Sequence, residues 1–333
     1  MIGEDDLVRR IRAATAADRD GVIVGIGDDC AVLETTPGTR LIAKTDLLIE
    51  DVHFRRRYTE PADIGWKVLA VNISDIAAKG GRARWALVAL ACPATTTVEE
   101  IDAFYDGMLS LAREHGVAVV GGDTSSSPGG WFVNVSLLGE GTRVVLRSTA
   151  RPGDVIAVTN TLGRSAAGLA VLERERAPDG VDAETLADVT RAHLRPRPRV
   201  AEGRWLGAAE GVTAMMDLSD GLATDLGRLC VESGIGATVE IDSLPVAPGT
   251  RRVAGAVGRD ALAWATGGGE DYELLVACAP DVFHRVAGGL REATGTTLTR
   301  VGTCARGDRV RFVDGRGREI EVARGFEHFV SGR

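Results

Sequence analysis

The sequence predicts a two-domain protein of mixed α/β (α+β) class. Its 333 residues correspond to about two domains of ~150 residues each. Segments typical of strands and of helices alternate along both halves of the chain. The composition, 44% hydrophobic and 26% charged with 42 Gly and 11 Pro, is that of a globular protein able to bury a core.

Helix-starting residues and hydrophobic periodicity place the elements of the first half. Pro61 begins a helix over 62–79, and Thr97 with Glu100 makes a capping box for a helix over 97–115. Short apolar or alternating runs bounded by turn residues predict strands. The strands predicted in this way span 39–45, 85–91, 117–120 and 133–137.

A turn-rich segment over 149–154 (TARPGD) separates the two halves. We therefore expect an N-terminal domain over residues 1–148 and a C-terminal domain over 149–333. The second half shows the same mixture of short apolar runs and helical periodicity. Its strands are predicted at 155–159, 213–217, 237–241 and after 267–269, and its helices at 165–175, 183–193, 199–209 and 222–233.

Charge and lysine usage exclude several classes of function. With 39 Lys+Arg against 47 Asp+Glu, a net charge of −8 and 5% aromatic residues, we expect no nucleic-acid partner. The three lysines are Lys44, Lys67 and Lys79, and none lies in the Gly-Lys-Ser/Thr of a Walker A loop. The motif set of eukaryotic-type protein kinases is also missing. The sequence excludes both of these ATP-binding designs.

Cysteine usage and the N-terminal residues indicate a cytoplasmic protein. The five cysteines are scattered without a C-x-x-C pair, which predicts reduced thiols rather than disulfides or a zinc site. The N-terminus, MIGEDDLVRRI, lacks the pattern of a secretory signal. The longest nearly apolar run, 85–94, is shorter than the ~20 residues of a membrane span. We expect a soluble protein without a membrane partner.

Acidic residues stand at six junctions between predicted strands and loops. Any single junction is explained as well by a turn or a helix cap, because Asp and Gly are common there. Carboxylates without His or Cys are the hard oxygen ligands that Mg²⁺ prefers, and substrate phosphates commonly complete its shell. The six junctions together therefore predict a magnesium-dependent phosphate site. They contain Asp28, Asp46, Asp75, Asp123, Asp217 with Asp220, and Glu270 with Asp271.

Two glycine-rich segments, VVGGD (119–123) and TGGGED (266–271), are predicted to be loops. The backbone N–H groups of such loops can approach phosphate oxygens. Each segment is equally well explained as an ordinary turn. The GIG of residues 25–27 does not extend to G-x-G-x-x-G, which disfavours a Rossmann dinucleotide site.

Eight segments, in order over nearly the whole chain, resemble the thiamine-monophosphate kinase family of the aminoimidazole-ribonucleotide synthetase-like superfamily. The resemblance implies that superfamily's two-domain fold: an N-terminal sheet domain that dimerises, a C-terminal α/β domain and an ATP site between them. The segments are GIGDDCAVL (25–33), KTDLLIEDVHF (44–54), AVNISDIAAKGG (70–81), VGGDTSSSP (120–128), LRSTARPGD (146–154), MMDLSDGL (215–222), GGGEDYELL (267–275) and GFEHF (325–329).

The resemblance also assigns roles to individual residues. His53 and Phe326 have structural alternatives, as a partly buried histidine at a strand end and as a C-terminal core anchor. The implied magnesium ligands are Asp28, Thr45, Asp46, Asp75, Asp123, Asp217 and Asp220; the implied ATP contacts are Tyr105, Gly122, Arg147 and Ser219; the implied substrate contacts are His53, Glu270 and Phe326. Among these, the resemblance implies catalytic roles for Asp46, Asp123, Arg147 and Asp220.

The implied reaction is the ATP-dependent phosphorylation of thiamine monophosphate to thiamine diphosphate. Transfer of the γ-phosphoryl group would be direct and in line, with several Mg²⁺ ions and Arg147 neutralising charge. Two alternatives remain open. One is another ATP-dependent enzyme of the superfamily that acts on a different small molecule, and the other is a catalytically silent nucleotide-binding scaffold.

Three positions depart from the usual pattern of the family. Lys44 stands where Ser or Thr is common, Asp51 where Gly is usual, and Lys79 where Met is usual. An ammonium beside Asp46 would replace the charge of one metal ion, which leaves the magnesium count open. In the alternative, the Lys44 side chain points to solvent and only its backbone faces the site.

Overall fold

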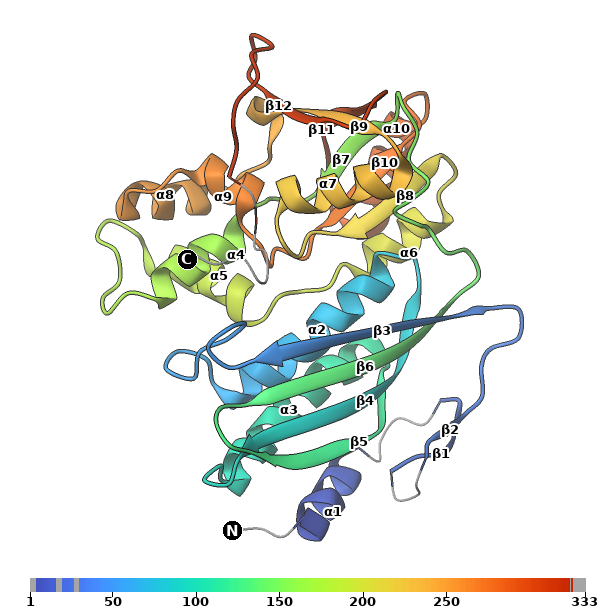
Figure 1. The fold of residues 1–333 in the computed structure, drawn as a ribbon, viewed down its shortest axis with the longest axis vertical. Helices are drawn as coiled ribbons and strands as arrows, with labels where there is room; N and C mark the ends of the chain where they lie inside the picture. The colour runs from blue at the N-terminus through green and yellow to red at the C-terminus, as the bar shows by residue number, and fades with distance from the viewer. Residues whose placement is uncertain (1–3, 16–19, 27–29, 324, 326–333) are drawn as a thin grey trace. The chain divides into compact units, whose positions relative to one another are not determined.

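The computed structural model describes residues 4–15, 20–26, 30–323 and 325 of the chain. The fold is of mixed α/β class, as predicted, and divides into two compact units (Figure 1). Unit 1 comprises residues 1–76 and 81–143, and unit 2 comprises residues 77–80 and 144–333.

Unit 1 is built on a four-stranded sheet in the order β3-β6-β4-β5. The β4 and β5 strands are parallel, and the other neighbouring pairs are antiparallel. Helices α2 and α3 lie against one face of the sheet (Figure 1). The elements are α1 (Glu4–Ala14), β1 (Val22–Val24), β2 (Val32–Leu33), β3 (Arg40–Ile49), α2 (Pro61–Ala77), β4 (Arg82–Pro93), α3 (Val98–His115), β5 (Ala118–Ser127) and β6 (Phe132–Gly141).

Helices α2 and α3 of unit 1 approach each other closely because both carry glycine at the contact. A Cβ atom at Gly65 would lie 1.9 Å from the Phe104 carbonyl oxygen, and one at Gly107 would lie 1.9 Å from the carbonyl oxygen of Ala62. The predicted capping box of α3 is confirmed, since the Thr97 side chain accepts from the Glu100 N–H at 3.3 Å. The packed helices provide a rigid cover for one face of the sheet.

Unit 2 is built on a six-stranded sheet in the order β12-β9-β11-β7-β10-β8. Only the β12 and β9 neighbours are parallel. The strands are β7 (Val155–Thr159), β8 (Val212–Asp217), β9 (Gly236–Glu240), β10 (Leu274–Cys278), β11 (Leu298–Ala305) and β12 (Val310–Val313). The helices are α4 (Arg164–Leu172), α5 (Ala183–Leu194), α6 (Val200–Ala208), α7 (Leu222–Ser233), η1 (Ile241–Ser243), α8 (Pro248–Val257), α9 (Ala261–Gly267) and α10 (Phe283–Thr294).

Helices cover both faces of the unit 2 sheet. One apolar core joins the strands to α7 through Leu226 and its neighbours, and a second joins them to α6 and α10 through Leu206 and Leu290. Every residue of β7 and β10 is consequently buried. This burial explains why these strands read in the sequence as continuous apolar runs rather than as alternating ones.

The strand predicted at 117–120 is longer in the structure. β5 continues to Ser127, so the Gly-Gly-Asp-Thr-Ser-Ser-Ser segment belongs to the sheet and pairs with β4. The prediction that 119–123 forms a loop is therefore wrong. Gly, Asp and Ser have low strand propensity, and pairing with the long β4 strand overrides it.

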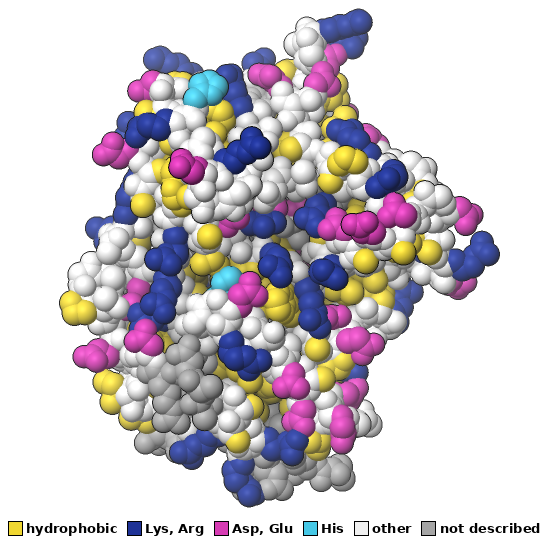
Figure 2. All heavy atoms as spheres, turned by 180° about the vertical axis from the view of Figure 1, so that it is seen from behind, with side chains coloured by type: hydrophobic (Ala, Val, Ile, Leu, Met, Phe, Trp, Pro, Cys, Tyr) yellow, Lys and Arg dark blue, Asp and Glu magenta, His cyan; other side chains and the backbone are white. Residues whose placement is uncertain are grey.

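Acidic and basic side chains are both spread over the face shown in Figure 2. Surface pairs such as Arg309 with Glu319, at 3.1 Å, contribute only about 0–1 kcal/mol each. All five cysteines are free, as predicted, and Cys230, Cys278 and Cys304 are buried. In the described part of the chain, no helix is long and apolar enough to cross a membrane.

Candidate active site

Lys44, Asp46 and Asp75 form a compact charged cluster in unit 1. Residues 44 and 46 are two positions apart on β3 and therefore point to the same face of the sheet. Helix α2 carries Asp75 on that face. The Lys44 Nζ lies 3.0 Å from Asp46 Oδ1 and 2.9 Å from Asp75 Oδ2. The structure thus brings together two of the predicted metal ligands. The alternative in which the Lys44 side chain points to solvent is wrong.

Burial and charge shift the proton affinities in this cluster. Burial raises the pKa of Asp46 to about 6, and the neighbouring Asp75 carboxylate adds to the rise while Lys44 opposes it. For Lys44, burial alone would lower the pKa, but Asp75 and Asp46 outweigh burial and raise it. Lys44 is therefore a permanent cation at neutral pH.

Thr45 occupies the opposite face of the sheet from this cluster. Its hydroxyl lies 3.1 Å from the Ser136 Oγ and accepts from Asn134 Nδ2 at 2.9 Å. The Asn134 Nδ2 also donates to the Asp46 carbonyl oxygen at 3.1 Å. Alternation along β3 separates the side chains of Thr45 and Asp46, so the structure does not bring the Thr45 hydroxyl to the carboxylate cluster.

Gly122 and Asp123 lie in β5 rather than in a loop. Gly122 has φ +153°, and a Cβ there would lie 1.8 Å from the Val88 carbonyl oxygen. The glycine is required by close contact with β4, whatever its role toward ATP. Asp123 pairs in register with Ala89 and accepts from the N–H of Thr124 at 2.9 Å. Ala89 in turn pairs with Asn134, so Asp123 shares a face with Thr45 rather than with Asp46.

The two other predicted residues of unit 1 lie in different surroundings. His53 follows β3 and is partly buried, and its Nδ1 accepts from the N–H of Ile49 at 3.0 Å. This acceptor role at Nδ1 places the ring proton of a neutral imidazole on Nε2. Tyr105 is buried in α3 with its ring edge-on to Phe104, and burial raises its pKa. The role of His53 toward the substrate and the role of Tyr105 toward ATP stay predictions.

Asp51 adopts a left-handed backbone conformation, with φ 65°, in the turn after β3. Glycine adopts this conformation without the Cβ penalty, which explains why glycine is usual at this position in the family. We expect Asp51→Gly to raise the free energy of unfolding by about 1 kcal/mol, measured by urea denaturation. Asp51→Ala, which keeps a Cβ, is the control. A stabilisation by alanine equal to that by glycine would contradict the explanation.

In unit 2, the loops 217–221 and 267–273 are joined by backbone hydrogen bonds. The Glu270 N–H donates to Ser219 O at 2.7 Å, Tyr272 N–H to Leu218 O at 2.9 Å, and Leu218 N–H to Glu273 O at 2.8 Å. A Cβ at Gly269 would lie 2.7 Å from Ser219 O. The predicted loop at 266–271 is confirmed from Gly268 onward. Its glycines permit packing against the other loop, and the Glu270 N–H is used there instead of facing a phosphate.

Asp225 is a site residue that the sequence analysis missed. It is fully buried in α7 and accepts from the Asp220 N–H at 2.9 Å, and burial raises its pKa to about 7. Arg228 pairs with Asp225 at 2.9 Å and also with the Asp220 carboxylate. The sequence signal that could have identified it is an acidic residue at a helix position that shares a face with the apolar Leu222 and Leu229. Asp217, at the end of β8, is buried, whereas Asp220 is partly exposed.

Glu270 and Asp271 have different surroundings although they are adjacent. Glu270 Oε2 lies 3.2 Å from Nδ1 of the buried His193, which also contacts the hydroxyl of Ser165 at 3.0 Å. Asp271 accepts from the N–H groups of Gly163 at 2.6 Å and Ser165 at 3.1 Å, and so caps α4. Burial raises the pKa of Asp271 to about 7. Both residues are partly accessible, but the Asp271 carboxylate is engaged in capping α4.

Arg147 is exposed in the segment that precedes β7. Its guanidinium lies 3.4 Å from Glu232, and its carbonyl oxygen accepts from the Ser233 hydroxyl at 2.8 Å. A long ion pair between two exposed side chains holds the guanidinium only weakly. The side chain therefore retains the freedom to bind an anion, and its role toward ATP stays a prediction.

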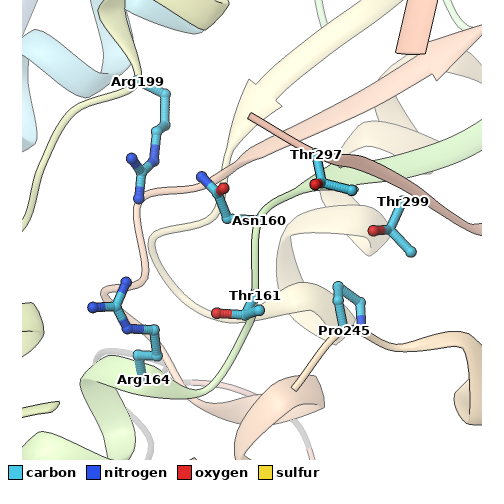
Figure 3. Close-up of a pocket in the computed structure, with 7 residues that line it drawn as sticks. All are labelled: Asn160, Thr161, Arg164, Arg199, Pro245, Thr297 and Thr299. Atoms are coloured by element: carbon cyan, nitrogen blue, oxygen red, sulfur yellow. The ribbon is translucent and has the colours of Figure 1, made fainter. Parts of the chain in front are cut away.

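A polar cavity of about 440 Å³ lies elsewhere in unit 2, lined by residues that the sequence analysis did not single out. Figure 3 shows Arg164 and Arg199 on one side of it and Thr297 and Thr299 on the other. Arg199 binds the buried Glu273 through two hydrogen bonds, of 2.9 and 2.6 Å. Arg164 pairs with Asp188. The charges of both guanidinium groups are therefore balanced within the protein.

Two predicted residues, Asp28 and Phe326, lie outside the described residues. Gly325, immediately before Phe326, donates its N–H to the hydroxyl of Thr224 at 2.9 Å. A Cβ at Gly325 would lie 1.6 Å from the Asp220 carbonyl oxygen. The GFEHF segment thus begins in contact with the predicted metal ligand Asp220, and glycine is the residue that this contact requires.

The side chains proposed to hold metal carry only oxygen donors. The candidate ligands are carboxylate and hydroxyl oxygens, which match Mg²⁺ and not zinc. Among the described residues, no group of three or more His, Cys, Asp or Glu side chains is placed to hold a metal ion. Mg²⁺ is commonly held by one or two carboxylates together with substrate phosphates. The residues present therefore fit magnesium that arrives with a nucleotide.

Known proteins similar to this chain share both of its domains. The family models "AIR synthase related protein, N-terminal domain" and "AIR synthase related protein, C-terminal domain" match residues 27–140 and 151–315. The thiamine-monophosphate kinase of Bacillus subtilis (strain 168) is 40% identical over 273 residues, covering 81% of this chain and 82% of the relative.

Two solved structures have the same fold as this chain. The thiamine-monophosphate kinase from Stenotrophomonas maltophilia K279a has a TM-score of 0.81 and 37% identity, with 92% of this chain and 95% of the other covered. AaThiL complexed with AMPPCP and TMP has a TM-score of 0.78 and 32% identity, with 98% and 97% covered. Both the sequence and the fold therefore agree with these relatives over most of the chain.

Proposed function

The chain belongs to the thiamine-monophosphate kinase family, and on that premise we propose that it phosphorylates thiamine monophosphate with ATP. The products are thiamine diphosphate and ADP. The observation that carries the proposal is the pairing of Asp46 and Asp75 around the Lys44 ammonium. The solved complex of a family member with AMPPCP and TMP supports it. Direct in-line transfer of the γ-phosphoryl group is the chemistry that these features support.

The side chains of this protein act by binding and orienting two anionic substrates. The acceptor phosphate is already ionised at neutral pH, so its attack requires no general base. His53, held through Nδ1 by the Ile49 N–H, presents Nε2–H as a hydrogen-bond donor and is assigned to hold the substrate. Arg147 supplies an exposed guanidinium that neutralises phosphate charge. Glu270 is assigned to the cationic end of the substrate.

Magnesium is the cofactor that the donor set fits. We assign the ligands that the family implies to more than one ion, in groups that lie on different parts of the fold. Asp46 and Asp75 lie on the α2 face of the unit 1 sheet, Thr45 and Asp123 lie on its other face, Asp217 and Asp220 lie in unit 2, and Asp28 lies outside the described residues. When bound, the metal neutralises phosphate oxygens and stabilises the charge of the transition state. Without it, carboxylates of this chain would repel both substrates. Removal of Mg²⁺ with EDTA should therefore abolish activity, and added Mg²⁺ should restore it.

The proposed reaction is tested by separating the products. The full chain is incubated with ATP, Mg²⁺ and thiamine monophosphate, and thiamine compounds and nucleotides are quantified by liquid chromatography. We expect thiamine diphosphate and ADP in equal amounts, and no thiamine monophosphate when unphosphorylated thiamine is offered instead. ATP hydrolysis without thiamine diphosphate would indicate a different substrate, and nucleotide binding without turnover would indicate a scaffold.

We also propose that the protein forms a homodimer through the face of the unit 1 sheet opposite α2 and α3. This face carries apolar residues that are unusually exposed, namely Leu41 (54%), Leu47 (47%), Leu87 (38%) and Phe132 (36%). Register places them on the face opposite α2, since Leu47 pairs with Asn134 and Leu87 with Ser136. Large apolar side chains exposed together on one face of a sheet are typical of protein interfaces.

Light scattering after size exclusion tests the dimer. The wild-type protein should have twice the chain mass of 35.0 kDa, and Leu47→Asp should have the mass of one chain, because a carboxylate in an apolar interface is costly to desolvate. Val231→Asp, at a residue of unit 2 that is 79% exposed, is the matched control and should leave the mass unchanged. A wild-type protein of 35.0 kDa would refute this assembly.

A further inference from the structure

The position of the Lys44 ammonium relative to Asp46 and Asp75 carries the inference. The nitrogen is 3.0 Å from one carboxylate oxygen and 2.9 Å from the other. The three side chains are 31%, 31% and 29% exposed, so the cluster is largely withdrawn from solvent. One ammonium thus bridges a carboxylate from a strand and a carboxylate from a helix.

The ammonium and a divalent ion exclude each other between these two oxygens. Mg²⁺ binds carboxylate oxygens at about 2.0–2.1 Å. An ion bridging Asp46 Oδ1 and Asp75 Oδ2 would have to lie in the space that the Lys44 nitrogen fills. Placing both cations there would add repulsion at a distance where charges in a partly buried site interact by several kcal/mol.

Regular secondary structure fixes the positions of the three side chains in the cluster. Lys44 and Asp46 lie two positions apart on β3, and this strand pairs with β6 along ten residues. Asp75 lies on the packed helix α2. The chain uses lysine at only three positions against 36 arginines. A lysine ammonium is a compact point charge. The residue type at position 44 therefore suits a narrow gap between two carboxylates.

We propose that the Lys44 ammonium takes the place of one divalent cation between Asp46 and Asp75. The inference rests on the proposed function, and it reduces by one the number of Mg²⁺ ions that the protein must bind for catalysis. The second oxygen of each carboxylate is left to metal that arrives with the nucleotide. Lys44 acts as a positioning residue, because it holds both carboxylates at the spacing that the substrate-bound metal requires.

Counting bound metal tests the proposal without turnover. Mn²⁺ replaces Mg²⁺, unbound Mn²⁺ is quantified by its electron paramagnetic resonance signal, and a saturating non-hydrolysable ATP analogue is present. Lys44→Thr removes the charge and adds a hydroxyl oxygen, and should bind one more Mn²⁺ per chain than the wild-type protein. Lys44→Arg keeps the charge and should bind the wild-type number. Equal counts for wild type and Lys44→Thr would overturn the proposal, as would an extra ion in Lys44→Arg.

Thermal unfolding gives a second readout that a merely structural lysine would not produce. Without metal, Lys44→Thr leaves two carboxylates facing each other and should melt below the wild-type protein. Mg²⁺ without nucleotide should raise its Tm and close most of that gap, with a smaller effect on the wild-type protein. A gap that Mg²⁺ leaves unchanged would contradict the proposal. If the Mn²⁺ counts of wild type and Lys44→Thr differ but no thiamine diphosphate forms, only the proposed function fails. If thiamine diphosphate forms but the two Mn²⁺ counts are equal, only this inference fails.

Discussion

Asp46→Asn should reduce kcat for thiamine diphosphate formation by at least about 10³-fold, equivalent to roughly 4 kcal/mol of transition-state stabilisation. An amide oxygen keeps the shape of the carboxylate but has no formal charge. The substitution therefore weakens the binding of the metal ion that must neutralise the transferring phosphoryl group. It also removes the charge of residue 46 from the ion pair with Lys44, so Asp75 is the one carboxylate left to that ammonium.

The same variant should remain folded, which separates chemistry from stability. Asparagine keeps an amide oxygen that can accept from Lys44, and Asp75 keeps its ion pair with Lys44 at 2.9 Å, so the substitution leaves no charge unpaired in the cluster. Circular dichroism and the Tm should therefore stay close to wild type. Asp106→Asn, at an exposed position of α3, is the control and should keep full activity. A near wild-type kcat in Asp46→Asn would remove Asp46 from the metal site.

Glu273→Ala should lower the free energy of unfolding by about 3–5 kcal/mol, with a fall in Tm of roughly 10 °C. The Glu273 carboxylate is buried and accepts from Arg199 at 2.9 and 2.6 Å and from the Thr159 hydroxyl at 2.6 Å. Its loss leaves a guanidinium at the cavity without its main carboxylate partner.

Two comparisons isolate the cause of this loss. Glu232→Ala removes a glutamate from an exposed pair with Arg147, at 3.4 Å, and should cost less than about 1 kcal/mol. The double variant Arg199→Met with Glu273→Leu removes both charges and should recover part of the stability lost in Glu273→Ala. Chemical denaturation measures all three. A Glu273→Ala variant as stable as Glu232→Ala would contradict the role assigned to the buried pair.

Local sequence signals predicted those parts of the fold that depend on neighbouring residues. The helix predicted at 222–233 has these bounds in the structure, because Gly221 and Gly234 flank it and both have positive φ. The capping box before α3 was correct for the same reason. By contrast, β5 extends to Ser127 because β4 is there to pair with it. That pairing connects residues far apart in the chain and overrides the low strand propensity of Gly, Asp and Ser.

The candidate site was predictable in residue type but not in arrangement. The clustering of Asp46 with Asp75 follows from α2 packing on β3, and a strand-by-strand reading identified both carboxylates without showing that one ammonium joins them. The buried Asp225 was missed because its role is to hold the backbone of Asp220, a contact that requires the turn to be built first. For the glycines of 267–269 the sequence left a phosphate contact and an ordinary turn equally open, and the structure shows that Gly269 is needed for packing on Ser219.

The destination of the γ-phosphate of ATP tests the central claim most directly. ATP labelled only at that phosphate is mixed with the full chain, Mg²⁺ and unlabelled thiamine monophosphate, and the label is followed in the separated products. Direct transfer predicts one label in thiamine diphosphate for every ADP formed, with little in inorganic phosphate. Label that appears in inorganic phosphate while thiamine diphosphate stays unlabelled would contradict the account.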